Sequence, residues 1–509
     1  MDERPQEYIR QNRKKIGIFV VFVILIFLIA LGIIILSRIH TNLPIVSSNK
    51  TIYVAGDGSG DFNCNGSDDQ IEINQALAYV EENPQFTTVH LRGPNTYVIS
   101  DSIFIGNNTI LEGDPTAVIK LENKADWPAG KPMIKERNSA GIQGVTIRGF
   151  EIYGNHDNNE DKKNGEGYYN MIRFLYSKDI QIHDMYMHDG HGDGLRVRNS
   201  SNIQFYNNKV YKLGHDGLYA IECKNVSAWN NCITCRTDSG LRIRDSNHVK
   251  FHDNMIDSFY NWSAGSSGIQ IEKSKNKVND VEVYNNTIHD TYGPGIWLIG
   301  FGEPDFKDDA KNVHIYHNIF YSTGKNPSID WVGGIVTSGF YDTLIENNVF
   351  DGVYHASIIH MYPKSTDDSI DLSPKGIGYT TIVRNNIIVN TQERKKDPDG
   401  TGYGVINYLP ETHTFVLENN LLYNNRGGRY KNADSKTDIY VDPLFVDQKN
   451  HDYRLISNVQ TEQKKALREF IRFEIQKIRT IFTWCQLPAT EVTGMDISDK
   501  ADHIVRMGG

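Results

Sequence analysis

Two short patterns of apolar and polar residues alternate through the middle of the chain. In the first, a glycine or another small residue precedes an apolar, variable, apolar triplet, as at residues 194–197, 217–220 and 240–243. These copies are 23 residues apart, and several later copies are farther apart because extra residues are inserted between them. In the second, an alternating strand ends in paired asparagines, as at residues 207–208. Each unit therefore predicts two or three strands of period 2 and no helix.

A unit of this length cannot bury its apolar face by itself, so its copies must stack on one another. Stacking predicts an all-β fold, a right-handed parallel β-helix, over residues 51–457. Successive coils of such a fold lie about 4.8 Å apart, so the paired asparagines fall one above another. Their amides can then bond along the stack and satisfy the turn backbone, which favours a structural ladder over a catalytic role.

Helical patterns flank the repeats. Residues 68–82 predict an amphipathic helix, with Ser67 or Asp68 as its N-cap, that covers the open strand edge of the first coil. Residues 461–484 lie within a tail at residues 458–509 and predict a basic amphipathic helix. This second helix either caps the last coil or forms a terminal extension.

An uninterrupted apolar run without any charge occupies residues 16–36. At a rise of about 1.5 Å per helical residue it spans roughly 30 Å, enough to cross a bilayer. We therefore expect a transmembrane anchor at residues 16–37, a cytoplasmic tail at residues 1–15 and a tether at residues 38–50. Basic residues on the N-terminal flank of the run favour a single-pass protein of the cell membrane with an external β-helix domain.

The composition restricts the classes of partner. A formal net charge of −10 on so large a domain argues against nucleic acid as a partner. A local basic strip is still compatible with this negative net charge. Five cysteines are too few and too scattered for a disulfide scaffold, and Cys232 and Cys235 are expected to pack as small residues rather than bind a metal. No cofactor is clearly indicated; calcium is conceivable at residues 57–69 or 156–161, without regular ligand spacing.

The two ends of the repeat region carry distinctive motifs. Tyr53-Val54-Ala55 and residues 58–62 open it, and residues 441–447 and 452–455 close it. Together with the repeats, these motifs resemble the disaggregatase-related proteins of methanogenic archaea and, more distantly, the pectate-lyase-like superfamily. The resemblance implies a cell-surface protein whose partner is an acidic extracellular polysaccharide, a uronate-containing and chondroitin-like matrix.

The variable position of each Gly-apolar strand faces away from the core, so these positions form outward columns along the stack. The columns form a basic and aromatic strip whose candidate substrate-binding residues are Arg196, Arg198, Tyr219, Arg244, Gln270, Glu272 and Trp297. A guanidinium fork suits a uronate carboxylate, and an aromatic face suits the apolar face of a sugar ring. The alternative is that the arginines pair with surface acids such as Asp193, Asp238, Asp245 and Glu272.

The turns before these strands are rich in titratable groups. The candidate catalytic residues are His191, Asp193, His215, Asp216, Asp238 and Arg242. Asp193 and Asp216 share one register, so their carboxylates should lie about 5 Å apart and raise one pKa. Asp193 and Asp238 lie two coils apart, close to the spacing of the acids in inverting glycosidases. The alternative is that Asp193 and Asp216 only bond turn amides.

The candidate catalytic and substrate-binding residues are compatible with two classes of function. The first is a carbohydrate-active enzyme that cleaves an acidic polysaccharide, either by hydrolysis or by elimination with Arg242, Lys212 or His215 as the base. The second is a non-catalytic surface protein that binds matrix glycan or serves as a rigid stalk.

Overall fold

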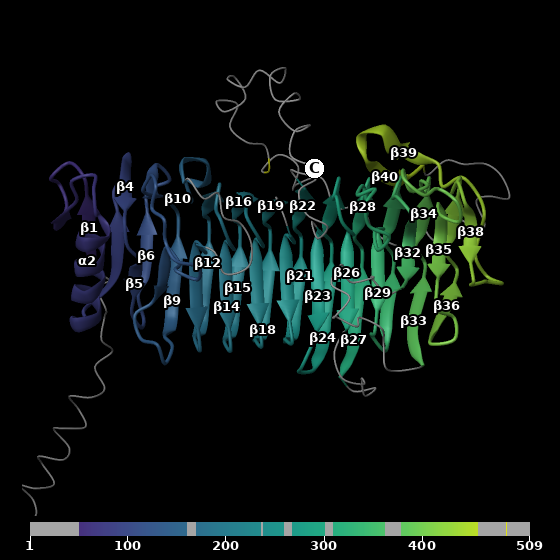
Figure 1. Cartoon of the computed structure of the whole chain (residues 1–509), viewed down its shortest axis with the longest axis horizontal. Helices are drawn as coiled ribbons and strands as arrows, with labels where there is room; N and C mark the ends of the chain where they lie inside the picture. The colour runs from purple at the N-terminus through teal and green to yellow at the C-terminus, as the bar shows by residue number, and fades with distance from the viewer. Residues whose placement is uncertain are drawn as a thin grey trace, which may run out of the picture. The chain divides into compact units, whose positions relative to one another are not determined.

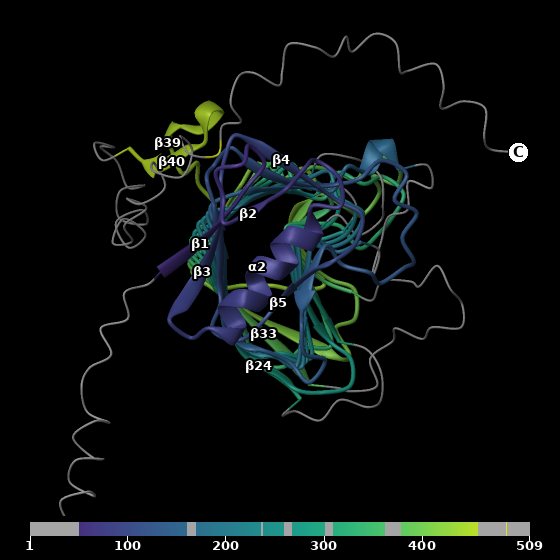
Figure 2. The same ribbon diagram turned by 90° about the vertical axis from the view of Figure 1, so that its left-hand side faces the viewer.

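The computed structural model describes residues 50–159, 169–235, 238–258, 267–300, 309–361 and 378–456, together with Cys485. These residues wind into a parallel β-helix of three long sheets (Figure 1), which confirms the fold expected from the repeats. Viewed from its N-terminal end, the three sheets surround a common core (Figure 2).

Each coil of the β-helix contributes one strand to each sheet. The first sheet contains, in spatial order, β2 (Phe62–Asn63), β1 (Lys50–Ala55), β3 (Phe86–Leu91), β6 (Ile110–Gly113), β9 (Gln143–Arg148), β12 (Lys178–His183), β15 (Ser201–Tyr206), β18 (Lys224–Trp229), β21 (Asn247–His252), β24 (Val278–Tyr284), β27 (Ala310–Tyr316), β30 (Thr343–Glu346), β33 (Tyr379–Arg384) and β36 (His413–Glu418). The second contains β4 (Asn95–Ile99), β7 (Ala117–Leu121), β10 (Glu151–Tyr153), β13 (Tyr186–His188), β16 (Lys209–Leu213), β19 (Cys232–Cys235), β22 (Met255–Ser258), β25 (Thr287–His289), β28 (Ile319–Tyr321), β31 (Val349–Asp351), β34 (Ile387–Val389) and β37 (Leu421–Tyr423).

The third sheet carries the Gly-apolar strands. It contains β5 (Ile103–Ile105), β8 (Ile134–Glu136), β11 (Ile172–Leu175), β14 (Leu195–Arg198), β17 (Leu218–Ile221), β20 (Leu241–Arg244), β23 (Ile269–Lys273), β26 (Ile296–Gly300), β29 (Ile335–Ser338), β32 (Ala356–His360), β35 (Tyr403–Asn407) and β38 (Gly428–Lys431). Leu195, Leu218 and Leu241 are register partners in neighbouring strands, and all three are fully buried. The 23-residue period therefore corresponds to one coil.

Other elements lie at the ends and corners of the coils. They are α2 (Gln70–Glu82), η1 (His156–Asn158), η2 (Gln448–Asn450) and the antiparallel pair β39 (Phe445–Asp447) and β40 (Asp452–Leu455). The helix α2 lies across the N-terminal end of the β-helix (Figure 2) and buries the apolar side chains of Ile73, Leu77 and Val80, as its pattern predicts. The expected N-cap is wrong, because the helix begins after Asp69, whose carboxylate accepts the Asn65 and Val98 backbone N–H groups instead.

The predicted membrane anchor and most of the C-terminal tail lie outside the described residues. Within the described ranges, no helix is both long and apolar enough to cross a membrane.

One expectation about the cysteines is wrong. Cys232 does not simply pack as a small residue, because it forms a disulfide with Cys485, 253 residues later in the chain. The bond ties the tail to the second sheet beside a pocket of about 350 Å³, lined also by Lys209 and Asp257. The repeat pattern gives no indication that Cys485 lies close to β19, so this pairing could not be predicted from spacing.

The paired asparagines form the expected ladder. The first residue of each pair adopts a left-handed conformation, for example Asn207 with φ 56° and Asn230 with φ 53°, which asparagine tolerates well. The second residue is buried, and its side-chain amide donates to the side-chain oxygen of the next coil. The ladder runs through Asn208, Asn231, Asn254, Asn286, Asn318, Asn348, Asn386 and Asn420, and ends at Asp438.

Replacing Asn254 by alanine is expected to lower the free energy of unfolding by about 2–3 kcal/mol, because it leaves several buried polar groups without partners. Its Nδ2 donates to the Ala228 carbonyl at 3.0 Å, and its Oδ1 accepts the Asn231 backbone N–H at 3.1 Å. Chemical denaturation measures the loss. The exposed Asn276→Ala variant is the control and should change stability by less than about 0.5 kcal/mol; equal effects of both variants would contradict the ladder.

Candidate active site

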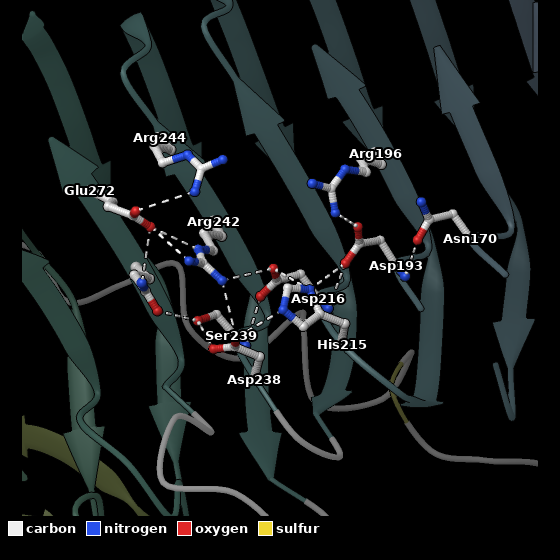
Figure 3. Close-up of polar contacts among 11 residues, drawn as sticks. Asn170, Asp193, Arg196, His215, Asp216, Asp238, Ser239, Arg242, Arg244 and Glu272 are labelled. Atoms are coloured by element: carbon white, nitrogen blue, oxygen red, sulfur yellow. Dashed lines mark hydrogen bonds and ion pairs between the residues drawn. The ribbon is translucent and has the colours of Figure 1, made fainter. Parts of the chain in front are cut away.

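The candidate site lies on the outer side of the third sheet, at the turns that precede β14, β17 and β20 (Figure 3). Each of these turns ends in a glycine; Asp193 and Asp216 directly precede theirs, whereas Ser239 separates Asp238 from Gly240. Because the coils are in register, the turns stack and bring Asp193, His215, Asp216 and Asp238 into one cluster.

One oxygen of each stacked aspartate supports the backbone of the next coil. The Asp193 backbone N–H donates to the Asn170 side-chain oxygen at 2.8 Å, and the Asp216 N–H donates to Asp193 Oδ1 at 3.0 Å. The Ser239 N–H donates in turn to Asp216 Oδ1 at 2.8 Å. The interpretation that Asp193 and Asp216 bond turn amides is therefore correct for these oxygens, and it leaves the other oxygen of each carboxylate for different contacts.

His215 is the centre of the cluster. Its Nδ1 lies 2.6 Å from Asp193 Oδ1 and 3.0 Å from Asp216 Oδ2, and its Nε2 lies 3.1 Å from Asp238 Oδ2. Polar atoms of Asp193, His215 and Asp216 lie within 4.8 Å of one another, as the one-coil spacing predicts. A single imidazole therefore connects three carboxylates from three successive coils.

Arg242 closes the cluster on the C-terminal side. Its guanidinium donates to Asp238 Oδ2 at 3.0 Å and to Glu272 Oε2 at 2.7 Å, and it lies over the Tyr219 ring with its carbon 4.4 Å from the ring centroid. Burial opposes the charge, but Asp238 and Glu272 outweigh burial and raise the pKa of Arg242 well above its usual value. Arg242 is therefore a fixed cation, which argues against its predicted role as a base.

His215 and the three carboxylates around it have pKa values shifted in different directions. Burial opposes the charged form of each, yet Asp216 and Asp193 raise the pKa of His215 well above its usual value. Against the same burial, His215 lowers the pKa of Asp193, and Arg242 followed by His215 lowers that of Asp238. For Asp216, burial prevails and raises the pKa to about 6. At neutral pH the cluster thus holds a protonated imidazole, two firmly ionised carboxylates and one carboxyl near its titration point.

The predicted binding strip is less open than the sequence suggests. Tyr219, Gln270, Glu272 and Trp297 are buried, and one face of the Trp297 ring stacks on Trp331 with 4.2 Å between centroids. The strip is therefore not a continuous open surface.

The arginines of the strip pair with acids, as the alternative interpretation expects. Arg196 contacts Asp193 at 3.1 Å and Arg198 contacts Glu222 at 3.2 Å. Arg244 lies 3.7 Å from Glu272. Half of the Arg198 side chain is exposed, compared with 27% for Arg244 and 14% for Arg196, so these three retain access to solvent.

His191 occupies different surroundings. It is fully buried, and its ring contacts Tyr169 and His156, with centroids 4.6 Å and 4.7 Å away.

Sequence reasoning missed Asn170 and Ser239, which begin and end the hydrogen-bonded column through Asp193 and Asp216. Their position before the next strand of the repeat was the signal that could have identified them.

The regions considered for calcium have other bonding partners. The Asp57 carboxylate accepts the Ser59 backbone N–H at 3.0 Å, and the Asp69 carboxylate bonds backbone N–H groups. His156 lies 3.0 Å from the Asp157 carboxylate, while residues 160–161 are outside the described ranges. The cluster of Asp193, His215 and Asp216 has ligand-type atoms at metal-like spacing, but His215 would first have to lose its proton.

Comparisons with known proteins agree with the fold. The family described as "Disaggregatase related" matches residues 278–470, and the family described as "Right handed beta helix region" matches residues 87–309 and 170–350. No curated protein sequence matches the chain significantly.

Two solved structures are similar at low identity. The A-module of the mannuronan C-5 epimerase AlgE6 from Azotobacter vinelandii has a TM-score of 0.58 and 16% identity, covering 75% of this chain and 98% of that chain. The catalytic unit of a GH87 α-1,3-glucanase from Streptomyces thermodiastaticus strain HF3-3 has a TM-score of 0.51 and 17% identity, covering 73% of this chain and 66% of that chain. At these identities the similarity establishes the fold alone.

Proposed function

The chain belongs to the disaggregatase-related right-handed parallel β-helix proteins, and from this membership and the site geometry we propose that it cleaves an acidic, uronate-containing polysaccharide. The observation that carries the proposal is the contact between His215 and three carboxylates, one of which, Asp216, has its pKa raised to about 6 by burial. Groups whose pKa values are forced apart in this way can act as acid and base at the same pH.

Asp238 is the group that contacts the substrate in this proposal. About a fifth of its side chain is exposed, whereas Asp193 and Asp216 are fully buried. Arg242 and His215 lower its pKa, so the carboxylate is unprotonated when the substrate binds. The protonated His215 supplies a proton from Nε2 next to Asp238, while Asp193 and Asp216 face its opposite ring nitrogen, Nδ1. Arg196 and Arg244 are placed to neutralise a uronate carboxylate.

The 3.1 Å distance between His215 Nε2 and Asp238 Oδ2 places an acid and a base side by side, an arrangement that suits elimination. In elimination, Asp238 removes the proton at C5 of a uronate, the electron pair forms the C4–C5 double bond, and the leaving oxygen at C4 takes a proton from His215. One proton leaves C5 and the other reaches the oxygen on the adjacent C4, so an acid and a base side by side can serve both.

An assay of the full-length protein with uronate polymers tests the proposal. We expect an unsaturated product, detected by its ultraviolet absorbance, to appear together with new reducing ends. Reducing ends without unsaturation would identify a hydrolase. Binding without either signal, across chondroitin-like and pectic polymers, would reject the enzyme and favour the glycan-binding or stalk function, which the structural bonds of Asp193 and Asp216 also permit.

The proposed location is the cell surface, with the β-helix domain outside a membrane anchor at residues 16–37. The disulfide between Cys232 and Cys485 supports this location, because such bonds persist mainly in oxidising compartments. Labelling of the domain by a membrane-impermeant reagent on intact cells would test it.

A further inference from the structure

The outward column of the third sheet continues from the site toward the N-terminal end of the β-helix. In register, Arg196 pairs with Arg173 on β11, Arg173 pairs with Lys135 on β8, and Lys135 pairs with Phe104 on β5. Cationic side chains therefore occupy three consecutive coils, and neighbouring members of the column are about 4.8 Å apart at the backbone.

The positive charge of Arg173 is only weakly neutralised by nearby acidic side chains. Its NH1 group donates to the Gly130 carbonyl at 2.8 Å, and its Nε has no hydrogen-bond partner among the described residues. The Glu136 carboxylate is 3.9 Å from its NH2 group, and burial raises the pKa of Glu136, which disfavours the ionised form. A fifth of the Arg173 side chain is exposed, so it can still bind an incoming anion.

Lys135 interacts with acids only at longer range, through the charges of Asp101 and Glu136. Its Nζ lies 5.6 Å from the centroid of the Phe104 ring, and no ion pair joins it to an acid within the described part of the chain. The nearby Asp101 carboxylate is held by Lys131 at 2.9 Å. Like charges on adjacent strands repel, so folding alone does not explain Lys135 beside Arg173.

On the C-terminal side the same column loses its charge. It continues through Gln270, Trp297, Val336 and Ile359. The last three belong to a buried apolar cluster with Trp331. Beyond Arg242, a linear polyanion aligned with the column therefore meets no further cation through Ile359, whereas toward the N-terminal end it meets Arg196, Arg173 and Lys135.

We propose that Lys135 and Arg173 bind carboxylates of the acidic polymer, so that its charged units extend from Asp238 toward the N-terminal end of the β-helix. This inference rests on the proposed function and adds to it the direction of the bound chain. A guanidinium and an ammonium one coil apart suit successive carboxylates of a linear polymer. Both residues bind substrate away from the bond that breaks, so they affect KM more than kcat.

The test measures kcat and KM of the full-length protein on long and short uronate oligomers, using Lys135→Gln, Arg173→Gln and the double variant. We expect KM for long oligomers to rise about tenfold for each cation removed, with kcat nearly unchanged and with a smaller effect on the shortest substrate cleaved. The control is Arg148→Gln, because Arg148 lies on β9 of the same coil as Arg173 but faces outward from the first sheet, paired with Glu112 at 2.6 Å.

Each outcome has a distinct meaning. If the double variant behaves like Arg148→Gln while the unaltered protein cleaves uronate polymers, the inference is overturned and the proposed function stands. If the unaltered protein neither binds nor cleaves any uronate polymer, the proposed function fails first. Equal KM increases for long and short substrates would also overturn the inference, because the two residues would then not act on distant units.

Discussion

Replacing Asp216 by asparagine is expected to lower turnover of a uronate polymer by at least about 10²-fold, the usual lower bound for removing a group that takes part in acid–base catalysis. Asp216 Oδ2 lies 3.0 Å from His215 Nδ1, and a neutral asparagine at this position cannot stabilise the protonated imidazole that donates to the leaving oxygen. The pH dependence gives a second readout. The activity of the unaltered protein should increase as the pH rises through about 6, where Asp216 becomes ionised and stabilises the protonated imidazole, and the variant should lack this inflection.

Asparagine should fit the backbone at position 216. One coil away from Asp193, Asn170 already occupies this register, and its side-chain oxygen accepts the next backbone N–H at 2.8 Å. The matched control is Asp253→Asn, because neighbouring coils carry Asn230 and Asn285 at the equivalent position with the same left-handed backbone. We expect the control to retain full activity. Unaltered turnover in Asp216→Asn, or an equal loss in both variants, would remove Asp216 from the mechanism.

The coil architecture could be predicted because it rests on short-range patterns. A strand period of 2 and a unit of 23 residues place Leu195 and Leu218 one above the other, independently of the conformation of the connecting loops. The same register brought Asp193 and Asp216 together at the expected spacing. These inferences need only the repeat length and the rise between coils.

The outer face could not be predicted in the same way, because insertions decide what packs on it. Trp331 lies in the insertion between the coils of Trp297 and Val336, and it stacks on Trp297. A residue that appears to face solvent from its strand position is therefore buried. The disulfide of Cys232 has the same origin, since its partner comes from a tail that the repeat does not describe.

The protonation states also depend on tertiary packing. The sequence indicated that one of the two close carboxylates, Asp193 or Asp216, would have a raised pKa. It did not indicate which one. Arg242 lies nearer to Asp238, at 3.0 Å, than to Asp216 Oδ2, at 3.6 Å. The guanidinium therefore stabilises the charge of Asp238 more strongly, and Asp216 is left as the group that burial forces to retain a proton.

The C-terminal coils contain a second set of perturbed histidines that should control stability in acid. Burial lowers the pKa of His413 to about 2 and that of His360 to about 3, and the two rings stack with centroids 3.9 Å apart. Burial likewise lowers the pKa of His355 to about 3. In the unfolded chain a histidine titrates near 6.5. Below this pH the unfolded state therefore binds more protons, and stability falls as the pH falls from about 6.5 toward 3.

Asp216 limits this fall without reversing it, and His188 has no effect on it. Burial raises the pKa of Asp216 to about 6, so this carboxyl takes up a proton in the folded state and offsets one histidine between about pH 6 and 4. His188 has its pKa raised to about 9, because Asp189 and Glu151 outweigh its burial. Its contribution is already complete below pH 6.5 and does not change in this window.

Replacing His413 by phenylalanine is expected to make the acid-induced loss of stability shallower by up to about 1.4 kcal/mol per pH unit, or about 3 kcal/mol between pH 6.5 and 4. Phenylalanine preserves a ring against His360 but cannot accept a proton. At pH 7.5 the variant should be less stable by about 1 kcal/mol, because the 2.9 Å hydrogen bond between His413 Nε2 and Thr381 Oγ1 is lost. Denaturant unfolding across this pH range measures both effects. Parallel pH profiles for the two proteins would show that His413 becomes protonated without unfolding the coil, and would refute the assignment.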